Sequence, residues 1–327
     1  MITRFFAAAA ALTLTLPLAA QDEAEGAPSP GQIVAAAPSS EWVSIPAEDL
    51  LVMTLAPDAE GNEREVIIQL MPAPFSQGWV SNIRTLARAK WYDGISVNRV
   101  QDNYVVQWGD PNYDNPEASG KTKPLPEGLK VMGEDEYVEE RFYGNDGGPG
   151  DLEDFDFEAR NPRDVYANKT EFWKGFPIGG VYGSAWPVHC YGMVGVGRNY
   201  SPDTGSGAEL YTVIGHAPRH LDRNIALVGR IIAGMEHLSS LPRGKGELGF
   251  YAEDEIDKRT PILSIRVTSD LPKDEQPAYE YLSTESESFA QYAEARANRR
   301  DAFFIHPAGG ADICNIPVPI REVSGEE

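Results

Sequence analysis

The stretch VNRVQDNYVVQWGDP, residues 97–111, combines one arginine with a Tyr-Val-Val run, a glutamine and a Gly-Asp-Pro turn. It contains no histidine, cysteine or serine. It therefore offers neither a usual nucleophile nor a group that titrates near neutral pH. The pattern favours a chemistry that needs a permanent cation, an amide side chain and an apolar wall.

The composition predicts a folded, strongly acidic protein. The chain has 327 residues, of which 42% are hydrophobic and 10% aromatic, and a formal net charge of −22. This length is enough for one large domain or two small ones. Binding to a phosphate backbone needs clustered Lys and Arg, so the charge argues against a nucleic-acid-binding protein. It argues equally against binding to anionic membrane surfaces.

Residues 1–20 are typical of a secretory signal peptide. Arg4 precedes an apolar run over residues 5–16, and Leu18-Ala19-Ala20 resembles a cleavage site. A transmembrane helix is the alternative, but it needs roughly 20 apolar residues. We therefore expect an exported protein, periplasmic or secreted, that has no membrane segment after signal removal. Residues 21–41, rich in Ala, Pro, Ser and Gly, are predicted to be a flexible linker, with order beginning near Trp42.

Short apolar runs bounded by turn residues predict a mainly β fold. Ser76 is expected to cap a helix over residues 77–91, with Val80, Ile83 and Leu86 on one face. A second internal helix is expected over 233–241. Several short strands with only two internal helices favour a closed β-barrel with helical plugs. The expected strands lie at 50–56, 64–75, 95–100, 103–109, 193–197, 209–215, 225–232 and 262–267.

Two segments fall outside this regular pattern. Residues 112–180 are rich in Gly, Pro and Asp and are predicted to be a long irregular insertion of the kind that usually has a function. The acidic run over residues 151–158 lacks the ligand spacing of an EF-hand, so a solvated loop is favoured over a calcium site. Residues 269–327 are predicted to be a C-terminal extension with one helix, near residues 285–300.

The two cysteines, Cys190 and Cys314, suggest one disulfide in an exported protein, although two buried free thiols are also compatible with the sequence. A zinc site is not favoured because no CxxC or HExxH frame exists. His189 and Cys190 are adjacent, so on a strand they would point to opposite faces and not form a nucleophile–base pair. No metal and no cofactor are expected.

Two separated motifs, in the right order, resemble the cyclophilin family of peptidyl-prolyl cis-trans isomerases. WYDGISVNRVQDNYVVQWGDP, residues 91–111, is similar to the signature in which YDG…FHR leads through a Phe-Met pair to QGGDP. Residues 192–235 are similar to the family's small-residue strand, its SQFFI strand and its LDG…FGKV…GM run. The helix with Asn82 resembles the family's APKTVENF segment. The resemblance covers about residues 50–112 and 183–268, within a domain that we place at 42–268.

This resemblance implies an eight-stranded antiparallel barrel with a helix at each end and an active groove on one outer face. Arg99 stands at the family's catalytic arginine, and Gln107 at the glutamine that holds this arginine and the substrate backbone. The implied substrate-binding residues are Tyr104 and Val105 of the proline pocket, Gly197 and Arg198 with peptide-contacting backbone, the pocket residues Tyr211, Leu221 and Ile225, and His220 and Glu209.

The sequence also departs from the family pattern. Val97-Asn98 replaces Phe-His, and Trp108 replaces a glycine of the signature. Glu209 stands at a usual Gln, Ile225 at a frequent His and His220 at a frequent Trp. If Glu209 faced Arg99, an ion pair would weaken the arginine as a donor to substrate.

Prolyl isomerisation explains the opening pattern, because it makes and breaks no covalent bond. Its barrier of roughly 18–20 kcal/mol comes from amide resonance. A cationic donor aimed at the proline nitrogen, which becomes more basic as the amide twists, lowers this barrier, and an apolar pocket anchors the ring. We expect an isomerase that acts on unfolded or flexible proline-containing polypeptides. The alternative is a weakly active or inactive module that binds proline segments or a partner protein, and general chaperone activity of the insertion is a third possibility.

Overall fold

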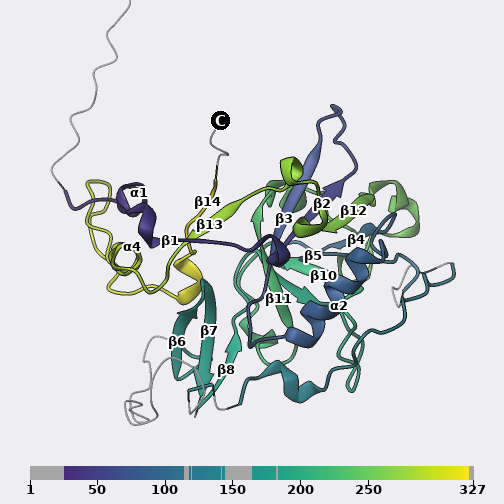
Figure 1. Ribbon diagram of the computed structural model, residues 1–327, viewed down its shortest axis with the longest axis horizontal. Helices are drawn as coiled ribbons and strands as arrows, with labels where there is room; N and C mark the ends of the chain where they lie inside the picture. The colour runs from purple at the N-terminus through teal and green to yellow at the C-terminus, as the bar shows by residue number, and fades with distance from the viewer. Residues whose placement is uncertain are drawn as a thin grey trace, which may run out of the picture.

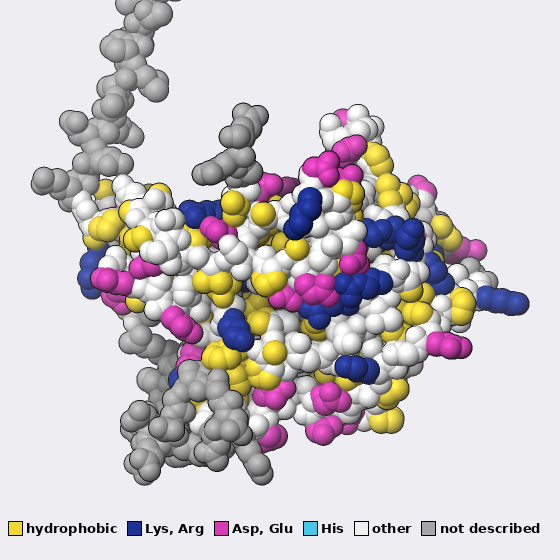
Figure 2. Space-filling model, in the orientation of Figure 1, with side chains coloured by type: hydrophobic (Ala, Val, Ile, Leu, Met, Phe, Trp, Pro, Cys, Tyr) yellow, Lys and Arg dark blue, Asp and Glu magenta, His cyan; other side chains and the backbone are white. Residues whose placement is uncertain are grey.

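The computed structural model describes residues 26–113, 118, 120–140, 142–143, 164–181 and 183–323. The predicted signal peptide and the acidic run at 151–158 lie outside the described residues. Within these ranges, no helix has the length and apolar character needed to cross a membrane. Figure 2 shows Lys and Arg side chains lying among Asp and Glu on the face drawn.

The predicted barrel is confirmed as an eight-stranded antiparallel sheet, on the right of Figure 1. The strand order is β12-β2-β3-β11-β9-β10-β5-β4. All eight expected strands belong to it, and their bounds are β2 Leu50–Leu55, β3 Arg64–Leu70, β4 Ser96–Val100, β5 Val105–Gly109, β9 Met193–Val196, β10 Leu210–Val213, β11 Leu227–Ala233 and β12 Ile262–Val267.

The two edge strands of this sheet, β4 and β12, come together and nearly close the barrel. Ser96 and Pro261 form an isolated bridge. The Val97 N–H donates to the Thr260 carbonyl at 2.9 Å, and the Ile262 N–H donates to the Ile95 carbonyl at 2.8 Å. These bonds satisfy backbone groups that an open sheet edge would leave exposed.

The barrel interior is closed by helix α2, Gln77–Arg88, whose buried face carries Trp79, Val80, Ile83 and Leu86. The helix follows the expected period, but Ser76 does not cap it as predicted. Ser76 adopts a left-handed conformation and its side chain makes no capping hydrogen bond. Gln77 instead donates from its side chain to the carbonyls of Met71 and Phe75, which fixes the turn into the helix. The other expected internal helix is the short α3, Glu236–Ser239.

The prediction of an irregular insertion at 112–180 is wrong for its last part, which forms two strands. Strands β6, Lys169–Trp173, and β7, Phe176–Val181, form a three-stranded antiparallel sheet with β8, Ser184–Pro187. The glycines of β7 are residues more typical of loops than of strands. At Gly180, however, a Cβ would lie 2.7 Å from the Tyr143 ring, so this glycine lets an aromatic side chain pack directly on the strand.

The prediction of a flexible linker is wrong for the described part of residues 21–41. Helix α1, Pro30–Ala36, begins there, with a capping box between Ser29 and Gln32 and proline in its first turn. Ile33 and Val34 of α1 pack against a cluster that contains Phe289 and Tyr292 of helix α4, Glu287–Ala297. Apolar burial against α4 therefore orders a segment whose composition resembles a linker (Figure 1).

The C-terminal extension contains the expected helix, α4, and also contributes strands. β13, Tyr279–Leu282, pairs with β14, Ile320–Glu322, and with β1, Trp42–Ser44, from the start of the ordered chain. Cys190 and Cys314 form the disulfide that the sequence suggested, across 124 residues. The extension is therefore bonded covalently to the segment between β8 and β9.

Candidate active site

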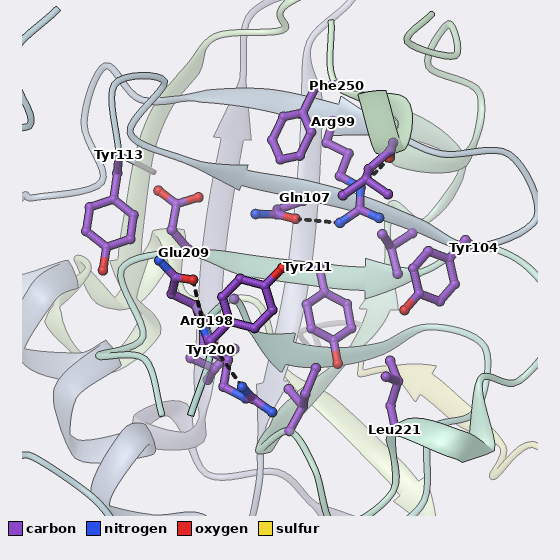
Figure 3. Close-up of a pocket in the computed structure, with 16 residues that line it drawn as sticks. Arg99, Tyr104, Gln107, Tyr113, Arg198, Tyr200, Glu209, Tyr211, Leu221 and Phe250 are labelled. Atoms are coloured by element: carbon purple, nitrogen blue, oxygen red, sulfur yellow. Dashed lines mark hydrogen bonds between the residues drawn. The ribbon is translucent and has the colours of Figure 1, made fainter. Parts of the chain in front are cut away.

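A cavity of about 520 Å³ lies on the face of β4, β5 and β10 opposite the barrel core (Figure 3). Its central row is set by strand register, because Arg99 pairs with Gln107 and Gln107 pairs with Tyr211 on three neighbouring strands. The residues that line it are Arg99, Tyr104, Val105, Gln107, Tyr113, Val196, Gly197, Arg198, Asn199, Tyr200, Glu209, Tyr211, Leu221, Ile225, Leu248 and Phe250.

Arg99 is held by three neutral acceptors. Its Nε donates to the Leu248 carbonyl at 2.7 Å, its Nη1 donates to the Gln107 Oε1 at 3.2 Å, and its Nη2 donates to the Gln101 Oε1. In the described part of the chain, Arg99 makes no salt bridge to a carboxylate. Burial lowers the pKa of Arg99, because desolvation disfavours its charge, yet a guanidinium stays protonated at neutral pH.

The guanidinium also lies over two aromatic rings. Its central carbon is 5.5 Å from the ring centroid of Tyr104 and 5.5 Å from that of Phe250. Such contacts attract a cation without neutralising it. Arg99 therefore combines a fixed position with a full charge.

An apolar cluster separate from the barrel core forms one end of the cavity. Val105, Tyr211 and Val213 are buried in it, and Tyr104 and Ile225 pack against them. Leu221, from the 3-10 helix η5, Arg219–Leu221, completes this wall. In Figure 3 Tyr104, Tyr211 and Leu221 lie on the Arg99 side of the cavity. An apolar wall of this kind can hold a proline ring next to the guanidinium.

Glu209 lies at the opposite end of the cavity and is only 4% exposed. Its Oε1 accepts from the Asp110 N–H at 2.8 Å. Burial raises the pKa of Glu209 to about 8, with the nearby Asp110 charge acting in the same direction, so the carboxyl is mostly protonated at pH 7. The ion pair with Arg99 considered from the sequence does not form.

The structure brings ten of the eleven predicted site residues to this one cavity. His220 is the exception. It is exposed and stacks against Tyr104, with 6.5 Å between ring centroids. Arg198 lines the cavity, but its guanidinium donates to the carbonyls of Asn199 and Asn224 and so braces the loop.

Sequence reasoning missed the residues that position Arg99 from outside the matched motifs. Leu248 belongs to the 3-10 helix η6, Glu247–Gly249, and Phe250 forms a bridge with Arg99. No local pattern in the sequence indicates that this segment contacts the arginine. The position of Trp108 is a further finding. Its side chain is fully buried in the barrel core, so this departure from the signature does not reshape the cavity.

Among the described residues, no group of three or more His, Cys, Asp or Glu side chains is arranged to hold a metal ion. Cys190 is in the disulfide and His189 is bonded to Asp222 and Tyr211.

Comparison with known proteins gives a family. The sequence model of the "Cyclophilin type peptidyl-prolyl cis-trans isomerase/CLD" family matches residues 62–267. The chain belongs to this family. The matched range contains seven of the eight barrel strands, since only β2 lies before it. It also contains every residue that lines the cavity.

Solved structures extend this result. The chain is similar to the cyclophilin AquaCyp293 from Hirschia baltica, with 21% sequence identity, a TM-score of 0.59, and coverage of 88% of this chain and 95% of that chain. A Cryptosporidium parvum cyclophilin crystallised with the dipeptide Ala-Pro is 11% identical, with a TM-score of 0.36 and coverage of 67% and 97%. No curated protein sequence matches the chain. At these identities the structural likeness to AquaCyp293 establishes the cyclophilin fold.

Proposed function

We propose that this cyclophilin catalyses cis-trans isomerisation of Xaa-Pro bonds in exported polypeptides, with Arg99 stabilising the twisted amide. The observation that supports the proposal most strongly is the way Arg99 is held. Neutral acceptors fix its three nitrogens, and no carboxylate among the described residues neutralises it.

The remaining donors of Arg99 are suited to the reaction. A guanidinium has five N–H groups in a planar fork. The three hydrogen bonds use one on each nitrogen, which leaves one N–H on each Nη. As the prolyl amide twists, its nitrogen loses resonance and becomes a better acceptor. A donor fixed beside the apolar wall then binds the twisted state more strongly than either planar isomer, which is the condition for catalysis.

The apolar end of the cavity supplies the second requirement. Tyr104, Val105, Tyr211, Leu221 and Ile225 would enclose the proline ring and hold it while the preceding carbonyl rotates. Gln107 is placed between Arg99 and Tyr211 by register, so it can fix the arginine and reach the substrate backbone. The departure at Ile225 keeps this end apolar.

The position of Glu209, which bonds to the Asp110 N–H and makes no ion pair with Arg99, favours the enzyme over a binding module without turnover. An ionised Glu209 paired with Arg99 would have consumed the donor that the reaction needs. A protonated carboxyl instead has the hydrogen-bonding capacity of the family's usual Gln at this position, because it can both donate and accept. We therefore retain the isomerase assignment.

The proposed clients are unfolded or flexible proline-containing segments of other exported proteins. The signal-peptide pattern of residues 1–20 supports export, and so does the disulfide, since disulfides persist in oxidising compartments.

Exchange spectroscopy by NMR on an Ala-Pro peptide tests the proposal. Uncatalysed exchange takes tens to hundreds of seconds. Wild type is expected to bring exchange into the range that this experiment detects, and Arg99→Ala to return it toward the uncatalysed rate. Arg321→Ala is the matched control, because it removes an arginine that does not line the cavity and that bonds to Glu280, and it should retain most activity. Peptide binding with no acceleration by wild type would establish a proline-segment binder and refute the proposal.

A further inference from the structure

A buried chain of hydrogen bonds leaves the cavity wall at Tyr211. Tyr211 Oη lies 2.9 Å from His189 Nε2, and His189 Nδ1 lies 2.9 Å from Asp222 Oδ1. Arg219 then bridges two carboxylates, with Nε 2.6 Å from Asp222 Oδ2 and Nη1 2.9 Å from Asp164 Oδ2. The chain of hydrogen bonds thus contains five side chains, those of Tyr211, His189, Asp222, Arg219 and Asp164. His189 is completely buried and the other four side chains are almost completely so.

The partners of His189 define its tautomer. A carboxylate can only accept, and Asp222 is an ionised partner of Arg219, so the proton of the imidazole lies on Nδ1. Nε2 is then an acceptor, and the Tyr211 hydroxyl must donate to it. Burial lowers the pKa of His189, which keeps the ring neutral although Asp222 opposes this shift.

This bond determines what Tyr211 presents to the cavity. The hydroxyl is directed to His189, so the ring, without its polar group, forms the wall. Gly195 on β9 makes room for this arrangement. It pairs with Tyr211, and a Cβ at residue 195 would lie 2.3 Å from the Tyr211 hydroxyl oxygen. Tyr211 can therefore serve where the resembled family pattern has Phe, provided that its hydroxyl has a buried partner.

We propose that His189 is a positioning residue of the proline pocket. By accepting a hydrogen bond from the Tyr211 hydroxyl, it holds the ring in place and keeps the wall apolar. The inference rests on the proposed function, since it assigns His189 a role in binding the proline ring. Through Asp222 and Arg219, His189 is connected to Asp164. Asp164 belongs to the insertion, and Cys190 beside His189 is bonded to Cys314 of the extension. Both additions to the barrel thus support the same pocket wall.

A double-mutant cycle with His189→Leu and Tyr211→Phe tests this role. His189→Leu leaves the hydroxyl without its acceptor and should raise KM for an Ala-Pro peptide about fivefold, the factor that one ordinary hydrogen bond supplies, with little change in kcat. In the Tyr211→Phe background, which has no hydroxyl to bind, His189→Leu should change KM less than about twofold. An equal effect of His189→Leu in both backgrounds would overturn the inference, because the histidine would then act independently of the hydroxyl.

The ¹⁵N spectrum of the imidazole gives a readout that does not depend on catalysis. Wild type should show a protonated Nδ1 and an unprotonated, hydrogen-bonded Nε2 for His189, and Tyr211→Phe should shift Nε2 toward the position of a free acceptor. An Nε2 signal unchanged by Tyr211→Phe would refute this role of His189 even if His189→Leu failed to fold. If wild type bound the peptide without catalysing exchange, the proposed function would fail, and the same cycle in peptide Kd would decide the inference separately. Absence of both binding and catalysis would overturn both.

Discussion

Glu209 should make the free energy of unfolding fall as pH rises. In the folded protein burial raises the pKa of this carboxyl to about 8, against a usual value of 4.5. Between these two values the folded state binds more protons than the unfolded state, so stability decreases with increasing pH. The contribution is fully present below pH 4.5 and is lost as pH rises through about 8.

The magnitude follows from the same two values. One pKa unit corresponds to about 1.4 kcal/mol, so the complete loss above pH 8 is at most roughly 5 kcal/mol. Most of it, roughly 3–4 kcal/mol, falls between pH 5 and pH 8. Water penetration on ionisation would reduce this figure but would not reverse its sign.

Glu209→Gln removes this titration while keeping the shape of the side chain and its acceptor for the Asp110 N–H. Urea unfolding of both proteins should therefore be measured at pH 5, 7 and 8. The difference between variant and wild type isolates Glu209 from all other titrating groups. We expect the variant to gain stability relative to wild type steadily across this range. A difference that stays constant within about 0.5 kcal/mol would mean that Glu209 is ionised in the folded protein and that its environment is polar.

Two further predictions concern the site and the extension. Gln107→Ala should lower kcat about tenfold with little effect on stability, because Arg99 loses one of its three acceptors and its guanidinium is less well oriented. NMR exchange spectroscopy measures kcat and thermal unfolding measures stability. An unchanged kcat would mean that Gln107 does not position Arg99. Replacing both cysteines, Cys190→Ser with Cys314→Ser, should lower the free energy of unfolding by about 4 kcal/mol, because the disulfide closes a loop of more than a hundred residues. Denaturant titrations of the variant and of oxidised wild type measure this difference. Equal stability of the two proteins would show that the extension needs no covalent attachment.

The eight barrel strands could be predicted because each carries a local signal. Strands such as 64–70 and 193–196 are short apolar runs between turn residues, and such runs mark buried strands regardless of what they pair with. The cavity was predicted from the resemblance to the cyclophilins, which places Arg99 and Gln107 in one motif. The structure pairs these two residues on adjacent strands.

The elements that could not be predicted depend on contacts distant in sequence. Helix α1 has the composition of a linker and becomes ordered only by packing on α4, more than 250 residues later. Strand β7 contains two glycines and a proline, and only the pairing with β6 and β8 makes it a strand. The same holds for Leu248 and Phe250, which contact Arg99 from a segment without a motif that lies beside β4.

The role of His220 was inferred from the resemblance alone, and the structure places its side chain outside the cavity. Glu209 shows the opposite case. The residue type suggested a charge next to Arg99, whereas burial favours the neutral form and leaves the arginine without an ion pair.

We propose that Arg99 acts on the twisted amide and not on binding. The most direct test measures kcat and Kd for one Ala-Pro peptide with wild type and Arg99→Ala in the same NMR samples. We predict that kcat falls at least about a hundredfold, the usual effect of removing a donor that acts in the transition state, while Kd changes by no more than about threefold. A variant that loses affinity but keeps its kcat would contradict this role, because Arg99 would then bind the substrate without lowering the barrier.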